Sequence, residues 1–159
     1  MTSIVSDATA LIILAKLDRL DVLESLFTSV IIPSTVYAEI TIKPDHDTAR
    51  WHQGLFSIQD GSRLELCSAL QAILDPGEGE AIALATQLQL PLLMDEKKGR
   101  SIARSQGITV IGLVGVLLAL RKNGILDQAA IVELLDGAMQ AGFRLSPKLH
   151  EDFMRHIER

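Results

Sequence analysis

The sequence predicts an α/β fold with a central, mainly parallel β-sheet. Short apolar segments alternate with longer segments of helical periodicity, and this alternation is typical of strands connected by helices. The chain has 159 residues, which is enough for one domain with a sizeable core. Hydrophobic residues account for 48% of the sequence and aromatic residues for only 4%, which predicts an aliphatic core. No internal repeat or linker is visible, so we expect a single domain over residues 1–159.

The first half of the chain predicts two strands and three helices before a less regular region. The strands are expected at residues 3–6 and 30–32, and the helices at 8–17, 18–27 and 35–42. The first two helices carry more apolar residues than one core face requires, and we interpret the excess as a partner surface around Leu20, Leu23 and Leu26. Residues 44–47 break the pattern. Between residues 48 and 74, a helix through Trp51, a strand near 56–58 and a helix over 64–73 are expected.

Residues 75–97 predict a capped helix followed by a buried strand. Asp75 suits the N-cap position and Pro76 the first helical position. Glu78 lies at the N-terminal edge of the core-facing stripe of this helix, which is formed by Ala81, Ile82, Ala85 and Leu88. Glu80 lies about 200° round the helix from Glu78, so we expect it in solvent. The apolar run at 92–94 then predicts a parallel strand that ends at Asp95.

The last third of the chain predicts one further strand among helices. A charged helix is expected at 97–106 with Gly107 as its cap, followed by a strand at 108–110 and an apolar helix at 112–122. Asp127 is expected to cap a helix that ends at Met139, and a final amphipathic helix follows Ser146 and Pro147.

Composition and charge exclude several classes of protein. The net charge of −5 argues against a simple basic nucleic-acid-binding surface, although metal ions can bridge an acidic site to phosphate. Cys67 is the only cysteine, so no disulfide can form within the chain, which is typical of a reducing compartment. No basic segment precedes the first apolar residues, and the longest uncharged apolar stretch is shorter than the roughly 20 residues of a membrane span. We therefore expect a cytoplasmic protein without a membrane segment.

Four acidic residues are expected to meet at one edge of the predicted sheet. Asp7 and Asp95 each follow a strand, and the carboxyl ends of parallel strands line the functional crevice of an open sheet. Glu39 and Glu78 lie on helices near the same side. Four neighbouring carboxylates repel one another unless cations lie between them, and their hard oxygen atoms suit Mg²⁺ or Mn²⁺. Such a site can orient water and neutralise a phosphodiester during in-line attack.

The order and flanking residues of these acids resemble the PIN-domain nucleases, in particular the toxin-like ribonucleases of the VapC type and a compact PIN-like branch of uncharacterised proteins. The resemblance rests on four motifs and covers most of the chain. These motifs are Ile-Val-Ser-Asp-Ala-Thr at 4–9, Ile-Pro-Ser-Thr-Val-Tyr-Ala-Glu-Ile at 32–40, Gly-Glu-Gly-Glu-Ala-Ile-Ala-Leu-Ala at 77–85 and Leu-Leu-Met-Asp-Glu at 92–96. Each motif alone is weak, whereas their common order and spacing are fairly specific.

The resemblance implies a three-layer α/β/α PIN-like fold and a metal-dependent endoribonuclease. It implies that Mg²⁺ or Mn²⁺ is held by the four catalytic acids Asp7, Glu39, Glu78 and Asp95, with Thr9 as a supporting hydroxyl. It also implies an RNA substrate, products with a 5′-phosphate and a 3′-hydroxyl, a homodimer, and a small antitoxin that inhibits the enzyme as one half of a toxin–antitoxin pair.

Three positions depart from the pattern of the family. Glu78 stands where many relatives have Asp, Met94 where Thr or Ser is common, and Glu96 where a second Asp is frequent.

Each of the candidate residues also has a purely structural interpretation. Asp7 and Asp95 could cap the helices that follow them, and Glu78 could form a capping box with Asp75. Arg100 and Arg104 could contact RNA phosphates near the site, or they could belong to a solvated charged face together with Lys97 and Lys98.

Two other functions compete with the nuclease hypothesis. One is a PIN-like module that binds nucleic acid or protein after its catalytic site has decayed, and the presence of all four acids argues against it. The other is a different acidic α/β protein, such as a phosphatase or a receiver domain. A haloacid-dehalogenase-type phosphatase requires Asp-x-Asp after the first strand, but Ala8 and Thr9 follow Asp7 here. A receiver domain requires an acidic pair near Asp7 and a phosphoacceptor Asp after its third strand, and neither is evident.

Overall fold

A single parallel sheet forms the centre of the protein. The computed structural model describes residues 2–42 and 48–158, so the interruption predicted at residues 44–47 lies outside the described residues. The strands are arranged in the order β3-β2-β1-β4-β5, and all four neighbouring pairs are parallel. Their bounds are β1 Thr2–Ser6, β2 Phe27–Pro33, β3 Phe56–Gln59, β4 Leu92–Leu93 and β5 Val110–Ile111.

Helices connect the strands. The described elements are α1 Ala8–Lys16, α2 Asp21–Glu24, α3 Ser34–Ile40, the 3-10 helix η1 Ala49–His52, α4 Glu65–Leu70, α5 Pro76–Leu88, α6 Lys97–Ser105, α7 Leu113–Lys122, α8 Gln128–Gln140 and α9 Pro147–Ile157. The predicted caps Asp75, Asp127 and Ser146 each accept a backbone hydrogen bond at the start of a helix, which confirms those three starts. In the described part of the chain, no helix combines the length and the apolar character needed to cross a membrane.

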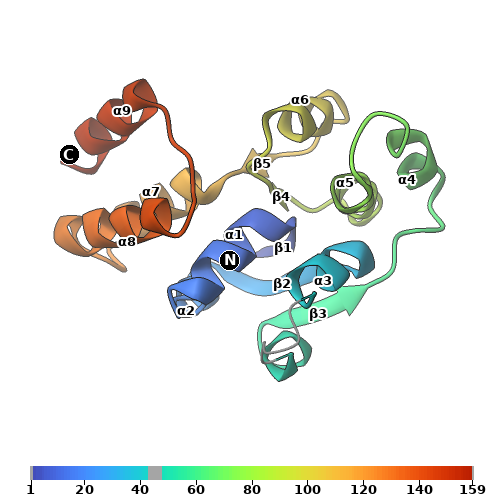
Figure 1. Cartoon of the computed structure of the whole chain (residues 1–159), viewed down its shortest axis with the longest axis horizontal. Coiled ribbons are helices and arrows are strands. Elements are labelled where there is room, and N and C mark those ends of the chain that lie inside the picture. Colours follow the sequence, from blue (N-terminus) through green and yellow to red (C-terminus); the bar gives the residue numbers. More distant parts are fainter. Residues whose placement is uncertain (1, 43–47, 159) are drawn as a thin grey trace.

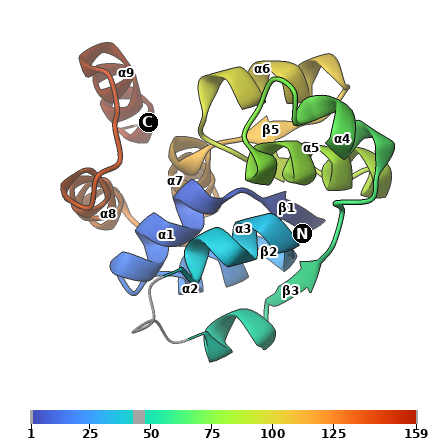
Figure 2. The same ribbon diagram turned by 45° about the vertical axis from the view of Figure 1, so that its right-hand side comes forward.

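The helices lie on both faces of the sheet, which confirms the predicted three-layer α/β/α architecture (Figures 1 and 2). Helices α1, α3 and α7 pack against one face, and α4, α5 and α6 pack against the other. Successive strand residues serve the two faces alternately, because the side chains of a strand point to opposite sides. Ile4 belongs to the first core and Val5 to the second, and Leu93 and Leu92 are divided in the same way.

The helix predicted at residues 18–27 is largely wrong. Only Asp21–Glu24 is α-helical, and Phe27 already begins β2, where it pairs with Thr2 of β1. Pairing along the centre of the sheet therefore outweighs the helical periodicity of a short segment. The expected partner surface is wrong at Leu23, which is fully buried in the core, while Leu20 and Leu26 are partly buried against the same core. This segment therefore offers no surplus apolar surface for a partner.

The connectivity of the sheet brings the ends of β1 and β4 together. The chain adds β2 and β3 on one side of β1 and then returns to add β4 and β5 on the other side. The direction in which successive strands are added therefore reverses between β1 and β4. Such a switch point leaves a crevice at the carboxyl ends of the strands. The backbone N–H of Asp7 donates a hydrogen bond to Leu93 O at 2.9 Å, which fixes the register of the two strand ends.

Burial of Leu23 predicts a measurable loss of stability on truncation. Leu23→Ala should lower the free energy of unfolding by about 2–5 kcal/mol, because it removes core contacts and leaves a cavity. Chemical denaturation gives this value directly. Leu149→Ala is the matched control, since the Leu149 side chain is 56% exposed and its truncation should have little effect. Equal effects of the two substitutions would contradict the position of Leu23 in the core.

Candidate active site

Asp7 and Asp95 stand at the ends of the two adjacent central strands. Asp7 is the N-cap residue of α1, but its carboxylate does not accept the hydrogen bond that an N-cap side chain usually accepts. The purely structural interpretation of Asp7 as a cap is therefore wrong, and this buried carboxylate is open to another role.

Asp95 caps a different helix from the one expected. Its Oδ1 accepts a hydrogen bond from the backbone N–H of Leu113 at 3.0 Å, so it caps α7, whereas the following residue, Glu96, caps α6 through Gly99 N–H at 2.6 Å. Gly112 makes this contact sterically accessible, because a Cβ there would meet Asp95 Oδ1 at 2.8 Å. The second oxygen, Oδ2, is buried and has no hydrogen-bond partner among the described residues. A buried oxygen of this kind is costly unless a ligand or cation satisfies it.

Glu78 enters the same region from the first turn of α5. Asp75 Oδ1 accepts a hydrogen bond from the Glu78 backbone N–H at 2.9 Å, which confirms the predicted cap and fixes the start of the helix. Burial and the neighbouring Asp75 carboxylate together raise the pKa of Glu78 to about 8, with smaller contributions from Asp7 and Glu96. Asp75 is therefore an additional acid of this region, and the signal for it was its position at the same helix end as Glu78.

Glu39 reaches the region from α3 and is the most exposed of the four predicted acids. Its carboxylate lies against the backbone of Gly77, where any Cβ would collide with Oε1. Burial and the charge of Asp75 raise the pKa of Glu39. The Gly-Glu-Gly-Glu motif thus begins with a glycine because α3 and its acid approach the start of α5 closely.

The four predicted acids form one electrostatic group. The pKa of Asp7 is raised to about 7, mainly by burial and also by the charges of Glu39, Asp75 and Asp95, against the lowering effect of the Ala8 amide. Burial also raises the pKa of Asp95, which the Leu113 amide and Arg100 partly offset. We use the term acidic cluster for these four residues together with the two capping acids, that is Asp7, Glu39, Asp75, Glu78, Asp95 and Glu96.

The acidic cluster fits a divalent cation in its donor chemistry. Its side chains offer only carboxylate oxygens, which Mg²⁺ and Mn²⁺ prefer, and a cation would both relieve the mutual repulsion and satisfy Asp95 Oδ2. Within residues 2–42 and 48–158, however, no three His, Cys, Asp or Glu side chains converge closely enough to bind one ion as they stand. Binding would therefore require the carboxylates to move together from their present positions.

Met94 and Thr9 take different positions relative to the acidic cluster. Met94 is buried in the core between the sheet and α6, and Gly99 leaves room for its sulfur, so this departure from the family pattern serves packing. Thr9 is exposed in the first turn of α1 and lines a groove of about 840 Å³ together with Asp95 and Glu96. Its hydroxyl is therefore accessible to a ligand at the edge of the acidic cluster.

Glu80 is fully buried, so the expectation that it lies in solvent is wrong. One carboxylate oxygen accepts a hydrogen bond from Thr35 N–H at 2.7 Å, and the other accepts one from Gly61 N–H at 2.8 Å. The hydroxyl of Ser34 donates to the same carboxylate at 2.7 Å. Glu80 thus joins α5 to the start of α3, the helix that carries Glu39, and to the connection after β3.

The chain is similar to a known protein family in sequence and to a solved protein in structure. The sequence matches the family DUF3368, whose description is "PIN domain", over residues 3–159. A PilT N-terminus domain protein from the archaeon Sulfolobus solfataricus has a similar structure, with 18% identity and a TM-score of 0.48, over 92% of this chain and 100% of that chain. No curated protein matches the sequence significantly.

The raised pKa values predict that the metal-free protein loses stability as the pH rises. Asp7 and Glu78 have folded pKa values of about 7 and about 8, above the ordinary values of 3.8 and 4.5. Between pH 4 and about 8 the folded state therefore binds more protons than the unfolded state, and stability falls across this window. Asp7→Asn should make the free energy of unfolding depend less steeply on pH. It should also raise that free energy at pH 8 by roughly 1–3 kcal/mol.

The measurement is chemical denaturation in EDTA at several pH values between 4 and 8. Asp136→Asn is the matched control, because Asp136 is exposed on α8, and this change should shift stability by no more than about 0.5 kcal/mol. If Asp7→Asn left the slope unchanged, Asp7 would not be a buried, repelled carboxylate.

Replacement of Glu80 by its amide should destabilise the fold. The two oxygens of Glu80 accept hydrogen bonds from two different backbone N–H groups, so in either orientation the amide nitrogen of a glutamine faces a donor. We expect Glu80→Gln to reduce the free energy of unfolding by about 1–3 kcal/mol, as for other buried donors left unsatisfied. Urea denaturation of Glu80→Gln and of the exposed control Glu133→Gln tests this, and similar stabilities of the two variants would contradict it.

Proposed function

Because the chain belongs to a PIN-domain family, whose members are generally metal-dependent nucleases, we propose that it is a divalent-metal-dependent endoribonuclease. The observation that supports this most strongly is the acidic cluster itself. Four carboxylates, from the ends of β1 and β4 and from α3 and α5, have raised pKa values at the switch point of the sheet. One buried oxygen of Asp95 lacks a partner among the described residues. A fold that served only for binding would have no need to hold these charges together.

The proposed metal ligands are Asp7, Glu39, Glu78 and Asp95, with Mg²⁺ or Mn²⁺ as the cation. When bound, the cation supplies charge neutralisation at the phosphodiester and lowers the pKa of a coordinated water molecule. Asp7 and Asp95 are suited to position it, because the register of β1 and β4 fixes their backbones and Leu113 N–H orients Asp95. Glu78 is held by the rigid first turn of α5, and the more exposed Glu39 is free to adjust its carboxylate.

Residues beside the acidic cluster are proposed to orient the RNA. The exposed hydroxyl of Thr9 is able to donate a hydrogen bond to a phosphate oxygen at the edge of the site. Arg100 and Arg104 line the same groove as Thr9 and Asp95, and they are the proposed phosphate contacts. We propose that water attacks phosphorus and that the bond to the 3′ oxygen breaks, which leaves a 5′-phosphate and a 3′-hydroxyl.

The wider biological role is proposed from the resemblance to VapC-type proteins alone. In this role the chain is the toxin of a toxin–antitoxin pair, forms a homodimer, and is inhibited by a small protein partner. The surface around Leu23 no longer supports the homodimer, because Leu23 is part of the core. Light scattering at micromolar concentration tests the dimer, and a monomer at that concentration would remove it from the proposal.

Cleavage of end-labelled single-stranded RNA tests the nuclease. We expect cleavage in Mn²⁺ or Mg²⁺ and none in EDTA, and a loss of at least about 100-fold in rate for Asp7→Asn or Glu78→Gln, as is typical when a group that stabilises transition-state charge is removed. Asp136→Asn on α8 should cleave at the wild-type rate. Calorimetry should also show weaker Mn²⁺ binding by Asp7→Asn than by the wild type. Binding of RNA without cleavage in either metal would favour the alternative, a binding module with a decayed site.

A further inference from the structure

The groove next to the acidic cluster extends well beyond the residues of the proposed chemistry. It occupies about 840 Å³, within the roughly 300–1,000 Å³ typical of ligand-binding clefts. One wall comes from α6 and β5, the floor comes from α7, and the other wall comes from α9 and the connection between α8 and α9. Figures 1 and 2 show α9 standing apart from α6 on the opposite side of this region.

Cations gather in this groove although the protein as a whole carries a net charge of −5. Lys97, Arg100 and Arg104 come from α6, and Arg144 comes from the opposite wall. Burial lowers the pKa of Arg100, and the neighbouring charge of Arg104 lowers it further. Within the described part of the chain, none of these four side chains has a carboxylate within ion-pair distance. These four cations outnumber the three acids that line the groove, Asp95, Glu96 and Asp152, although the charge of Asp95 acts on Arg100. The groove therefore presents an excess of positive charge to an anionic ligand.

The inner surface of the groove is apolar. Phe143 and Leu145 are half-buried, and Leu149 is exposed, so these side chains are accessible from the groove. Ile111 of β5 and Val114 and Leu118 of α7 add further aliphatic side chains to the lining. A cationic rim above accessible aromatic and aliphatic side chains is the arrangement that binds single-stranded nucleic acid, whose bases are free to pack on apolar surfaces.

We propose that this groove binds the segment of single-stranded RNA that flanks the phosphodiester at the acidic cluster, with Arg144 as a phosphate contact on its far wall. The inference rests on the proposed nuclease function. Asp95 and Glu96 of the acidic cluster line the same groove as Arg100, Arg104 and Arg144, so a strand with one phosphate at the acidic cluster can contact these cations within one continuous groove. An acidic peptide fits the rim as well, but its carboxylates would be repelled at the end of the groove that the acidic cluster occupies.

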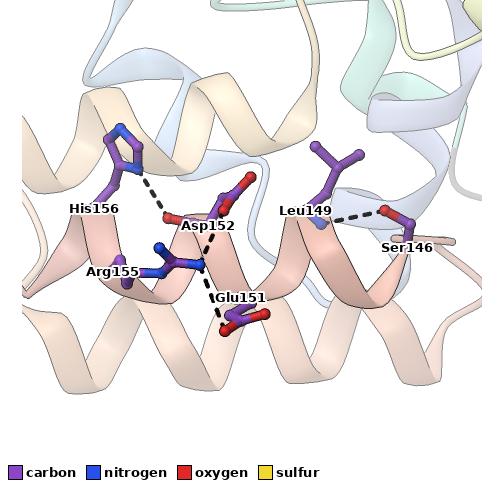
Figure 3. A network of polar contacts seen from close by, with 6 residues as sticks. All are labelled: Ser146, Leu149, Glu151, Asp152, Arg155 and His156. Carbon is purple, nitrogen blue, oxygen red and sulfur yellow. Dashed lines mark hydrogen bonds and ion pairs between the residues drawn. The ribbon is translucent and has the colours of Figure 1, made fainter.

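Helix α9 provides a matched control for Arg144. Figure 3 shows Arg155 on this helix, where its guanidinium pairs with Glu151 at 3.5 Å and with Asp152 at 3.4 Å. Arg155 does not line the groove, whereas Arg144 lines it and is unpaired. Both side chains are exposed, so replacing either by glutamine removes one positive charge without disturbing the core.

The test combines RNA binding with cleavage. A 12-nucleotide, fluorescein-labelled single-stranded RNA is titrated with each protein between 50 and 200 mM KCl, and anisotropy gives Kd. Arg144→Gln should raise Kd about tenfold, the loss expected for one hydrogen bond to a charged group. It should also reduce the slope of log K against log salt by about 0.7. Cleavage with saturating Mn²⁺ should show a raised KM and an unchanged kcat, while Arg155→Gln should match the wild type throughout.

The possible results separate this inference from the nuclease proposal. If Arg144→Gln cleaved RNA with the KM of the wild type, and its RNA binding depended on salt as in the wild type, the groove inference would be overturned. The nuclease proposal would be unaffected by that result. Weakened binding by Arg144→Gln without cleavage by any variant would support the groove and overturn the nuclease. Leu149→Glu, which places a negative charge on the apolar surface, should weaken RNA binding independently of Arg144. Competition by a 12-residue polyglutamate peptide as strong as that by unlabelled RNA would overturn the choice of ligand.

Discussion

The pairing of β1 with β4 is the constraint on which the candidate site depends. In the register of these strands, Val5 pairs with Leu92 and Ser6 pairs with Leu93. This register places Asp7 and Asp95 at neighbouring strand ends. The backbones of the two strand ends are held together, because the backbone N–H of Asp7 donates a hydrogen bond to Leu93 O. The repulsion between these carboxylates is therefore built into the sheet, and the aliphatic core on both faces must supply the stability that tolerates it.

The acids of this region divide into those that stabilise the backbone and those that remain open. Asp75, Glu96 and Glu80 accept backbone hydrogen bonds that fix the starts of α5, α6 and α3. Asp7 makes no such capping bond, and Asp95 uses one oxygen as a cap and leaves the other without a partner. Asp75 and Glu80 thereby fix the starts of the helices that carry Glu78 and Glu39, while Asp7 and Asp95 follow β1 and β4. This division explains how a protein can hold so many carboxylates in one region and still fold.

The sequence predicted the sheet, the layers and the helix caps because these depend on local patterns, such as Asp75 before Pro76. It failed where the surroundings of an element decide the outcome. The expectation for Glu80 assumed that one face of α5 is exposed to solvent. Residues 77–85 are all buried, because α3 and α4 pack on the sides of α5 that the sheet leaves free. Leu23 was likewise placed on a helix surface, whereas it belongs to the core beside the start of β2. Helical phase gives the direction of a side chain, but it does not say what lies there.

Net charge is a weak guide to nucleic-acid binding in this protein, because the position of the charges matters more than their sum. In the proposed RNA complex, the acidic cluster repels the phosphate backbone, and Lys97, Arg100, Arg104 and Arg144 of the same groove attract it. At an ionic strength of about 0.15 M the Debye length is about 8 Å, so each of these groups acts mainly on the phosphates nearest to it. The four basic side chains can bind a strand on their own. One of its phosphates can lie at the acidic cluster only if cations neutralise the carboxylates. Divalent metal would in this way couple catalysis to the register of the strand, since without it the favoured position of every phosphate lies away from the acidic cluster.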